Sequence, residues 1–135
     1  MLSPKRVKFR KMHRGRMKGK ALKNNILING NLGIQALECS WVTATQIEAV
    51  RKTIARYTKR SGKIWIKIFP DKSVTERAAE SRMGTGKGAV SHWVSVVRPG
   101  TILFEIAGIE ENTALLALKI ASYKLPLKTK IIKKL

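Results

Sequence analysis

The segment "TATQIEAVRKTIARYTKRSGKIWIKIF" (residues 43–69) decides the fold class, because the spacing of its apolar residues changes part-way along it. Its first part has Thr43 and Gln46 at the spacing of a capping box, followed by apolar residues at helical intervals. That apolar stripe consists of Ile47, Val50, Ile54 and Tyr57. After Gly62, isoleucines alternate with other residues, as in a half-buried strand. The segment therefore predicts a helix of about four turns, followed by a strand over residues 63–69.

Two more strand candidates lie further along the chain. They are "HWVSVVRPG" (92–100) and "TILFEIAG" (101–108), and Pro99-Gly100 between them is typical of a tight turn. We expect a hairpin here, which excludes a simple succession of parallel crossovers. Residues 26–42 predict one or two short strands with a bend, whereas residues 71–81 have no strong period.

The C-terminal part predicts a second helix over residues 110–125 and then either a closing strand or a basic tail over 128–135. The inward stripe of that helix has two candidates: Leu115, Leu118 and Ser122, or Leu116, Ile120 and Tyr123. The order of elements predicts an α+β fold, with two helices packed on a mixed, mostly antiparallel sheet. We expect one domain over residues 26–135, with a projecting loop at about 71–91 and a basic arm over 1–25.

The charge of the chain points to a polyanionic partner. The 135 residues include 28 Lys and Arg against 8 Asp and Glu, a formal net charge of +20. Such an excess repels the folded chain from itself unless a polyanion neutralises it. Nucleic acid is the expected partner. An anionic membrane is the alternative that the sequence disfavours, because it has no apolar run long enough to span a bilayer and no long helix that is cationic on one face only.

The N-terminal segment excludes acidic residues altogether. The first one is Glu38, and the preceding 37 positions carry ten Lys or Arg. One interpretation is a disordered, solvated tail; the other, which we favour, is an arm that becomes ordered on phosphate. Its candidate phosphate-binding residues are Lys5, Arg6, Lys8, Arg10, Lys11, His13, Arg14, Arg16, Lys18 and Lys20.

The first predicted helix carries a second group of cations on the face away from its apolar stripe. This group consists of Arg51, Lys52, Arg56, Lys59 and Arg60. A solvated helix face, with cations suited to the C-terminal end of the macrodipole, is one interpretation. Because Glu48 is the one acidic residue nearby, we expect instead a surface that binds phosphates.

The segment "RMGTGKGAVSHW" (82–93) resembles a nucleotide-binding loop but fails the tests for one. A phosphate-binding NTPase loop needs Ser or Thr after Gly-Lys, and here Gly88 follows Lys87. The glycine spacing of a dinucleotide site is met, but the flanking segments are not a buried strand and a helix. No nucleophile has an identifiable base, and Cys39 with two histidines cannot form a metal cluster. We therefore expect no enzymatic activity, no cofactor and no metal, and a loop whose glycines let backbone approach phosphate.

Four segments in order resemble large-subunit ribosomal protein sixteen of the bacterial and organellar type. They are "SPKRVKFRKMHRGRMKG" (3–19), "INGNLGIQALE" (28–38), "IFPDKSVTERAAESRMGTGKGAVSHWVSVVRPG" (68–100) and "KLPLKTK" (124–130). The resemblance covers nearly the whole chain. It implies an α/β-hammerhead-like fold and binding of large-subunit rRNA by the arm. It also implies contact with A-site tRNA, with P-site tRNA as the alternative. The implied partners further include neighbouring large-subunit proteins, and no homo-oligomer is expected.

The resemblance also assigns the glycine-rich loop. The family has a loop that projects toward the peptidyl transferase region, and its positions match Arg82, Met83, Gly84, Thr85, Gly86, Lys87 and Gly88. Arg82 matches an arginine that is hydroxylated in some bacterial members, a modification that we do not assume here. Since the family's arm begins at Ser3, we expect no cleaved targeting segment. The composition is similar to that of plastid-encoded members, so a plastid (chloroplast) ribosome is the expected location and a bacterial cytoplasm the alternative.

Overall fold

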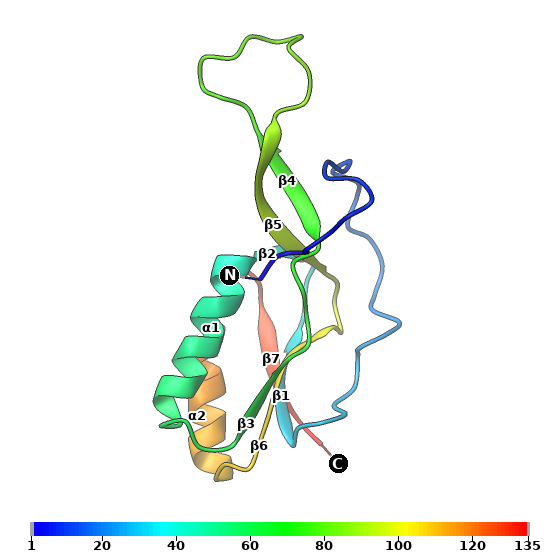
Figure 1. The fold of residues 1–135 in the computed structure, drawn as a ribbon. Helices are drawn as coiled ribbons and strands as arrows, with labels where there is room; N and C mark the ends of the chain where they lie inside the picture. Colours follow the sequence, from blue (N-terminus) through cyan, green and yellow to red (C-terminus); the bar gives the residue numbers. More distant parts are fainter. Residues whose placement is uncertain (1, 135) are drawn as a thin grey trace.

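The computed structural model describes residues 2–134, which form two antiparallel sheets, two helices and a long N-terminal arm (Figure 1). The elements in chain order are β1 (Leu32–Ala36), β2 (Ser40–Thr43), α1 (Ala44–Tyr57), β3 (Lys63–Ile66), β4 (Lys72–Glu76), β5 (Ala89–Val97), β6 (Ile102–Ala107), α2 (Glu111–Ser122) and β7 (Thr129–Lys133). One sheet has the order β3-β6-β1-β7 and the other the order β2-β5-β4. All neighbouring strands are antiparallel, and the predicted α+β class is confirmed.

Helix α1 begins where its sequence predicts. The Gln46 backbone N–H donates to Thr43 Oγ1 at 3.2 Å, and the Thr43 N–H donates to Gln46 Oε1 at 2.9 Å, so the capping box is formed. These two bonds satisfy donors that a helix start otherwise leaves unpaired. The buried stripe consists of Ile47, Val50 and Ile54. Tyr57, the fourth predicted member, is partly exposed, and Thr58 is buried in its place.

The predicted hairpin between residues 92 and 108 is wrong, although its turn is present. The Thr101 N–H donates to the Arg98 carbonyl at 3.1 Å, and Gly100 takes a φ of +97°. Beyond the turn the chain pairs with the end of β1 instead, because Ala36 exchanges hydrogen bonds with Gly100 and Thr101, each 2.9 Å long. Strand β5 therefore belongs to the three-stranded sheet and β6 to the four-stranded sheet.

Strand β4 lies in the segment for which we predicted no regular element. It pairs with β5 over five positions, and only Val74 among its residues is a large apolar side chain. The strand therefore depends on its neighbour rather than on its own pattern, which is why the periodicity does not reveal it. The β4–β5 hairpin projects from the body, and residues 77–88 form its loop (Figure 1).

The structure tests the alternatives that the sequence left open for α2 and for the C-terminal segment. The buried residues of α2 are Ala114, Ala117, Leu118 and Ala121. Of the two candidate stripes, only Leu118 is among them, Leu115 and Ser122 are half-buried, and Leu116 and Tyr123 of the other stripe are 51% and 72% exposed. The inward face is therefore made mainly of alanines, which neither candidate included. Residues 129–133 form strand β7 beside β1, so the closing strand is confirmed. The two helices pack together on one side of the four-stranded sheet, and the arm runs along the other side (Figure 1).

The core lies between the helices and the four-stranded sheet. Ile34 and Phe104 of the sheet and Ile54 and Leu118 of the helices have no exposed surface. Burial of each such side chain contributes about 1.5–3 kcal/mol. The arm takes part as well, because Leu2 packs against this core. The core thus fixes the positions of α1 and of the start of the arm.

Candidate nucleic-acid interface

The arm lies against the body mainly through its backbone, and among its cations Lys11 also contacts the hairpin. Its carbonyl groups accept hydrogen bonds from cations of the hairpin and the adjoining turn: Lys87 Nζ donates to Met12 O at 2.6 Å, Lys72 Nζ donates to Arg14 O, and Arg98 Nε donates to Lys18 O at 3.0 Å. All ten cationic candidates of the arm named above have exposed side chains. Because the carbonyls face the body, the arm presents its positive charge to solvent.

Asn24 fixes the point where the arm meets the four-stranded sheet. Its side-chain amide donates to the carbonyls of Lys67 and Ile102, both at 3.0 Å, and its own carbonyl accepts from the Ile102 N–H at 2.8 Å. Asn24 has a φ of 56°, a left-handed conformation that asparagine tolerates better than most residues. A single asparagine thus joins the arm to the start of β6 and to the residue that follows β3.

The arm ends at a buried carboxylate that sequence reasoning missed. Glu105 of β6 has no exposed surface, and it accepts backbone N–H bonds from Ile28 at 3.0 Å, Asn29 at 2.9 Å and Gly30 at 3.1 Å. Burial by itself raises the pKa of this carboxyl and is the largest single effect. The three N–H donors and the charge of Lys67 together outweigh it, so the pKa of Glu105 lies below its ordinary value.

The glycine-rich loop has an open tip and a tightly packed base. Met83 at the tip is 93% exposed, and Gly84 and Gly86 take φ values of +93° and +91°, where a Cβ added to either would have no atom within 4 Å. At the base, a Cβ on Gly88 would lie 2.3 Å from the Glu76 carbonyl oxygen, so only glycine fits there. The glycines therefore serve backbone conformation at the tip and close approach at the base.

The two cations of the glycine-rich segment 82–88 lie in different environments. Arg82 is exposed near the tip, and its carbonyl accepts from Thr85 Oγ1 at 2.8 Å. The Lys87 side chain instead donates to the Met12 carbonyl of the arm. Lys11 Nζ of the arm in turn donates to the Lys87 carbonyl at 3.1 Å. This reciprocal pair joins the arm to the base of the hairpin. Within residues 82–88, Arg82 is thus the cation whose side chain is exposed toward a partner.

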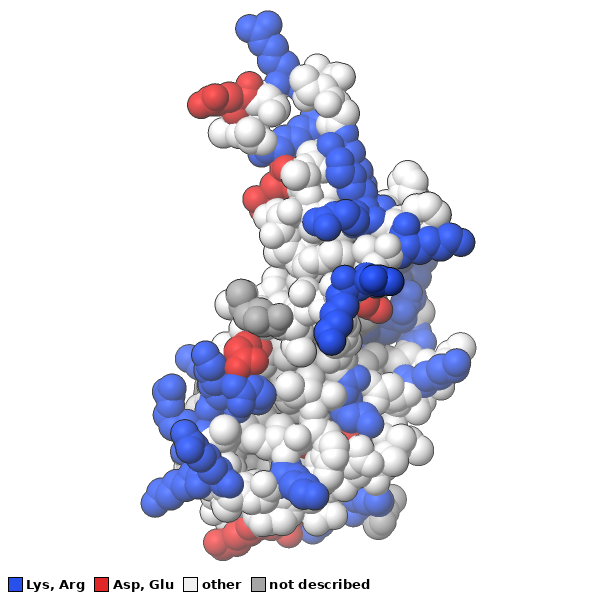
Figure 2. All heavy atoms as spheres, in the orientation of Figure 1, with Lys and Arg blue, Asp and Glu red and all other residues white. Residues whose placement is uncertain are grey.

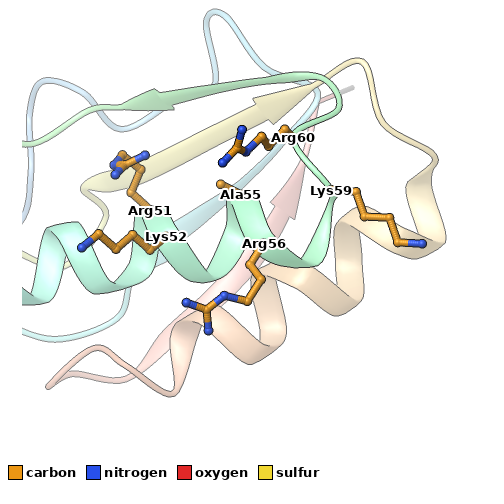
Figure 3. Close-up of a pocket in the computed structure, with 6 residues that line it drawn as sticks. All are labelled: Arg51, Lys52, Ala55, Arg56, Lys59 and Arg60. Carbon is orange, nitrogen blue, oxygen red and sulfur yellow. The ribbon is translucent and has the colours of Figure 1, made fainter.

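The cations of α1 line one hollow on its exposed face. Its lining residues are Arg51, Lys52, Ala55, Arg56, Lys59 and Arg60 (Figure 3). Arg51 pairs with Glu48 one turn earlier, and its hydrogen bond holds the pKa of the Glu48 carboxyl below the ordinary value. Within residues 2–134 one other ion pair is present, Lys133 with Glu111 at 2.9 Å. The hollow therefore combines five cations with one carboxylate at its edge.

The end of α1 is a Schellman turn made without glycine. The Arg60 N–H donates to the Ala55 carbonyl at 2.9 Å and the Lys59 N–H to the Arg56 carbonyl at 3.3 Å, which is the pairing that defines this motif. Lys59 and Arg60 have φ values of 54° and 63°. Glycine is the usual residue at the first of these positions, and a residue with a Cβ costs roughly 1–2 kcal/mol there. Lys59 and Arg60 therefore occupy left-handed backbone conformations, which are unfavourable for residues with a Cβ.

On the face shown in Figure 2, positive charge gathers in two main regions. Figure 2 shows Lys and Arg along the projecting hairpin and the arm beside it, and again over α1, with mainly uncharged surface between the two regions. Clustered cations of this kind are the electrostatic footprint of a nucleic-acid-binding protein. No helix in the described part of the chain is long and apolar enough to cross a membrane.

Comparison with known proteins assigns the chain to a family. The sequence profile of ribosomal protein L16p/L10e matches residues 4–132. The large ribosomal subunit protein uL16c of Emiliania huxleyi is 67% identical over 132 residues, which cover 98% of this chain and 96% of that protein. The proteins of the same name from Phaeodactylum tricornutum and Gracilaria tenuistipitata are 64% and 63% identical, over 98% and 99% of this chain and 96% and 99% of their own length.

The chain belongs to the ribosomal protein L16p/L10e family.

Membership of the L16p/L10e family confirms the predicted resemblance and the expected absence of enzymatic activity, because the family consists of ribosomal structural proteins. The relatives carry the name uL16c, in which the suffix denotes the chloroplast form, and this agrees with the predicted plastid location. The rejection of a nucleotide site also agrees with the fold. The pattern at Gly84 and Gly86 lies between two antiparallel strands, not between a strand and a helix.

The structure brings the predicted site residues together in two places. The five cations of α1 do come together in one hollow, and the arm lies beside the hairpin. Glu105 and Asn24, which hold the arm in place, were not predicted. A lone glutamate within the apolar run "TILFEIAG" was the available signal for Glu105, since a buried carboxylate requires hydrogen-bond donors.

Proposed function

We propose that the protein is a structural component of the large subunit of a plastid ribosome, in which its two cationic surfaces bind large-subunit rRNA. The family and the names of its relatives support the ribosomal role. The arm and α1 each expose a group of cations with few carboxylates nearby. Binding of this kind releases condensed counterions from RNA, and so its affinity falls steeply with salt concentration.

In the second part of the proposal, the projecting hairpin contacts tRNA in the A site near the peptidyl transferase region. Contact with P-site tRNA is the alternative. The single observation that carries this part of the proposal is the position of Arg82, exposed near the tip of a loop that stands away from the body (Figure 1). A narrow loop with glycines at its tip can enter a crowded RNA cavity where a broad one would collide. Neighbouring large-subunit proteins are the remaining proposed partners.

Reconstitution of large subunits with variants tests both parts. Arg82→Ala should enter subunits normally but slow A-site tRNA accommodation or peptide transfer. Removal of residues 1–20 should reduce incorporation first. The proposal for the loop would be refuted if Arg82→Ala blocked assembly and left translation by assembled subunits unchanged.

A free-standing nucleic-acid chaperone is the competing function, because it requires the same charge. Sedimentation after a high-salt wash distinguishes the two. A ribosomal component stays with large subunits, whereas a chaperone bound by charge alone is released as counterions compete for the phosphates.

A further inference from the structure

We infer that the end of α1 forms a shaped seat for one stretch of RNA sugar–phosphate backbone, with Ala55 as its floor. This inference rests on the proposed binding of rRNA and goes beyond it, because it assigns the contact to a defined hollow and adds a residue without charge. Figure 3 shows the short side chain of Ala55 between Arg51 and Arg60, with Lys52 and Arg56 toward the other side of the helix and Lys59 beyond its end.

The spacing of the lining residues suits a row of phosphates. Arg51 and Ala55 lie one turn apart on α1, as do Lys52 and Arg56, and Lys59 and Arg60 follow in the turn beyond the helix. Side chains four positions apart on a helix lie about 6 Å from one another, which is comparable to the separation of successive phosphates in RNA. Since Ala55 carries only a methyl group, a phosphate group can approach the helix there between Arg51 and Arg60.

The turn at the end of α1 supports the seat in a second, independent way. An uninterrupted helix would carry residue 60 onward along its axis, but the Schellman bonds fold the chain back, so that Arg60 borders the same hollow as Ala55. Lys59 occupies the position where glycine is favoured. A cation is thus kept at a strained position beside the hollow, an arrangement that lowers stability and that a phosphate ligand explains.

A variant that fills the hollow without changing charge separates a shaped seat from a diffuse positive surface. We expect Ala55→Leu to lower the affinity for protein-free chloroplast large-subunit rRNA about tenfold. The slope of log affinity against log salt should fall by about 1.5, as for the loss of about two phosphate contacts. The matched control is Asn112→Leu, which adds the same side chain at an exposed position of α2. Circular dichroism checks that both variants fold.

Substitution at Lys59 tests the strained turn. Lys59→Gly should raise the melting temperature of the free protein by about 3 °C and lower rRNA affinity about threefold or more. Lys59→Gln should lower the affinity equally without the gain in stability. Lys130→Gln, which removes an exposed cation from β7, serves as the control for loss of charge alone.

The outcomes are distinguishable. If the wild-type protein does not bind rRNA in a salt-dependent manner, the proposed function fails. If it binds and Ala55→Leu binds as tightly with the same salt slope, the seat is refuted and the surface is diffuse. If Lys59→Gly is no weaker in affinity than Lys130→Gln, the strained turn has no role in binding and the inference is overturned.

Discussion

The buried carboxylate of Glu105 gives the most exacting test of how the arm is held. Its two oxygens accept three backbone N–H bonds at 2.9–3.1 Å from residues 28–30. Glutamine is nearly the same size, but it has one acceptor oxygen and turns an N–H₂ group toward at least one of these donors. Glu105→Gln therefore removes the charge and leaves at least one buried donor unpaired, while the packing of β6 is retained.

The size of the effect follows from those bonds. A hydrogen bond to a charged group contributes about 1.5–3 kcal/mol, and loss of one or two predicts a decrease of about 3 kcal/mol in the free energy of unfolding. With an unfolding entropy of about 2.1 cal/mol/K per residue, the melting temperature should fall by about 10 °C. Circular dichroism of the full chain measures both quantities, with the exposed Glu76→Gln as the control.

The pH dependence of the same variant gives an independent check. Because the pKa of Glu105 is lowered in the folded protein, its carboxylate stabilises the fold at pH values above the unfolded-state pKa of about 4.3. That contribution declines as the pH falls toward the folded pKa. The difference between wild type and Glu105→Gln should therefore be full at pH 7 and shrink in acid. An equal difference at both pH values, or a fall in melting temperature no larger than that of Glu76→Gln, would refute the reasoning.

Three further predictions concern the helix start, the sheet and the junction of arm and loop. Thr43→Ala should lower the free energy of unfolding by about 1 kcal/mol in urea titrations, because the capping box is lost; an unchanged midpoint would contradict it. Gly33→Ala should destabilise by about 1–3 kcal/mol in the same titrations, since a Cβ there would lie 2.7 Å from the Phe104 carbonyl oxygen; an unchanged midpoint would show that the sheet accommodates the methyl group. Lys87→Met should make the arm more sensitive to trypsin without lowering the melting temperature; equal cleavage rates would show that the contact does not hold the arm.

Local signals in the sequence predicted the elements that depend on local interactions. The capping box at Thr43 and the period of α1 identified the helix because its hydrogen bonds join residues a few positions apart. The turn at Pro99-Gly100 was identified for the same reason. The partner of the following strand was not, because β1 rather than the turn selects it. A turn shows where the chain reverses, but not which strand it joins.

The candidate site was predictable in composition but not in arrangement. The cations of the arm and of α1 are visible in the sequence as runs without acidic residues. Glu105 could not be assigned a role, since its three donors lie 75–77 positions away. The contact of Lys87 with Met12 likewise spans 75 positions. The strain at Lys59 is also invisible in the sequence, because a lysine near the C-terminal end of a helix is expected to interact favourably with the helix dipole.

The central position of β1 has a consequence for the order of events during synthesis. Leu32 begins the first strand of the chain, yet its partners are Ile106 on one side and Lys133 on the other. At about 5–20 residues per second, about 4–15 s separate the synthesis of Leu32 from that of Ile106. For that interval the nascent arm is a free polycation with no body to lie on. Folding and capture of the arm by any nearby RNA are therefore in competition, and pulse-labelled chains should show an arm protected from protease only after β6 has emerged.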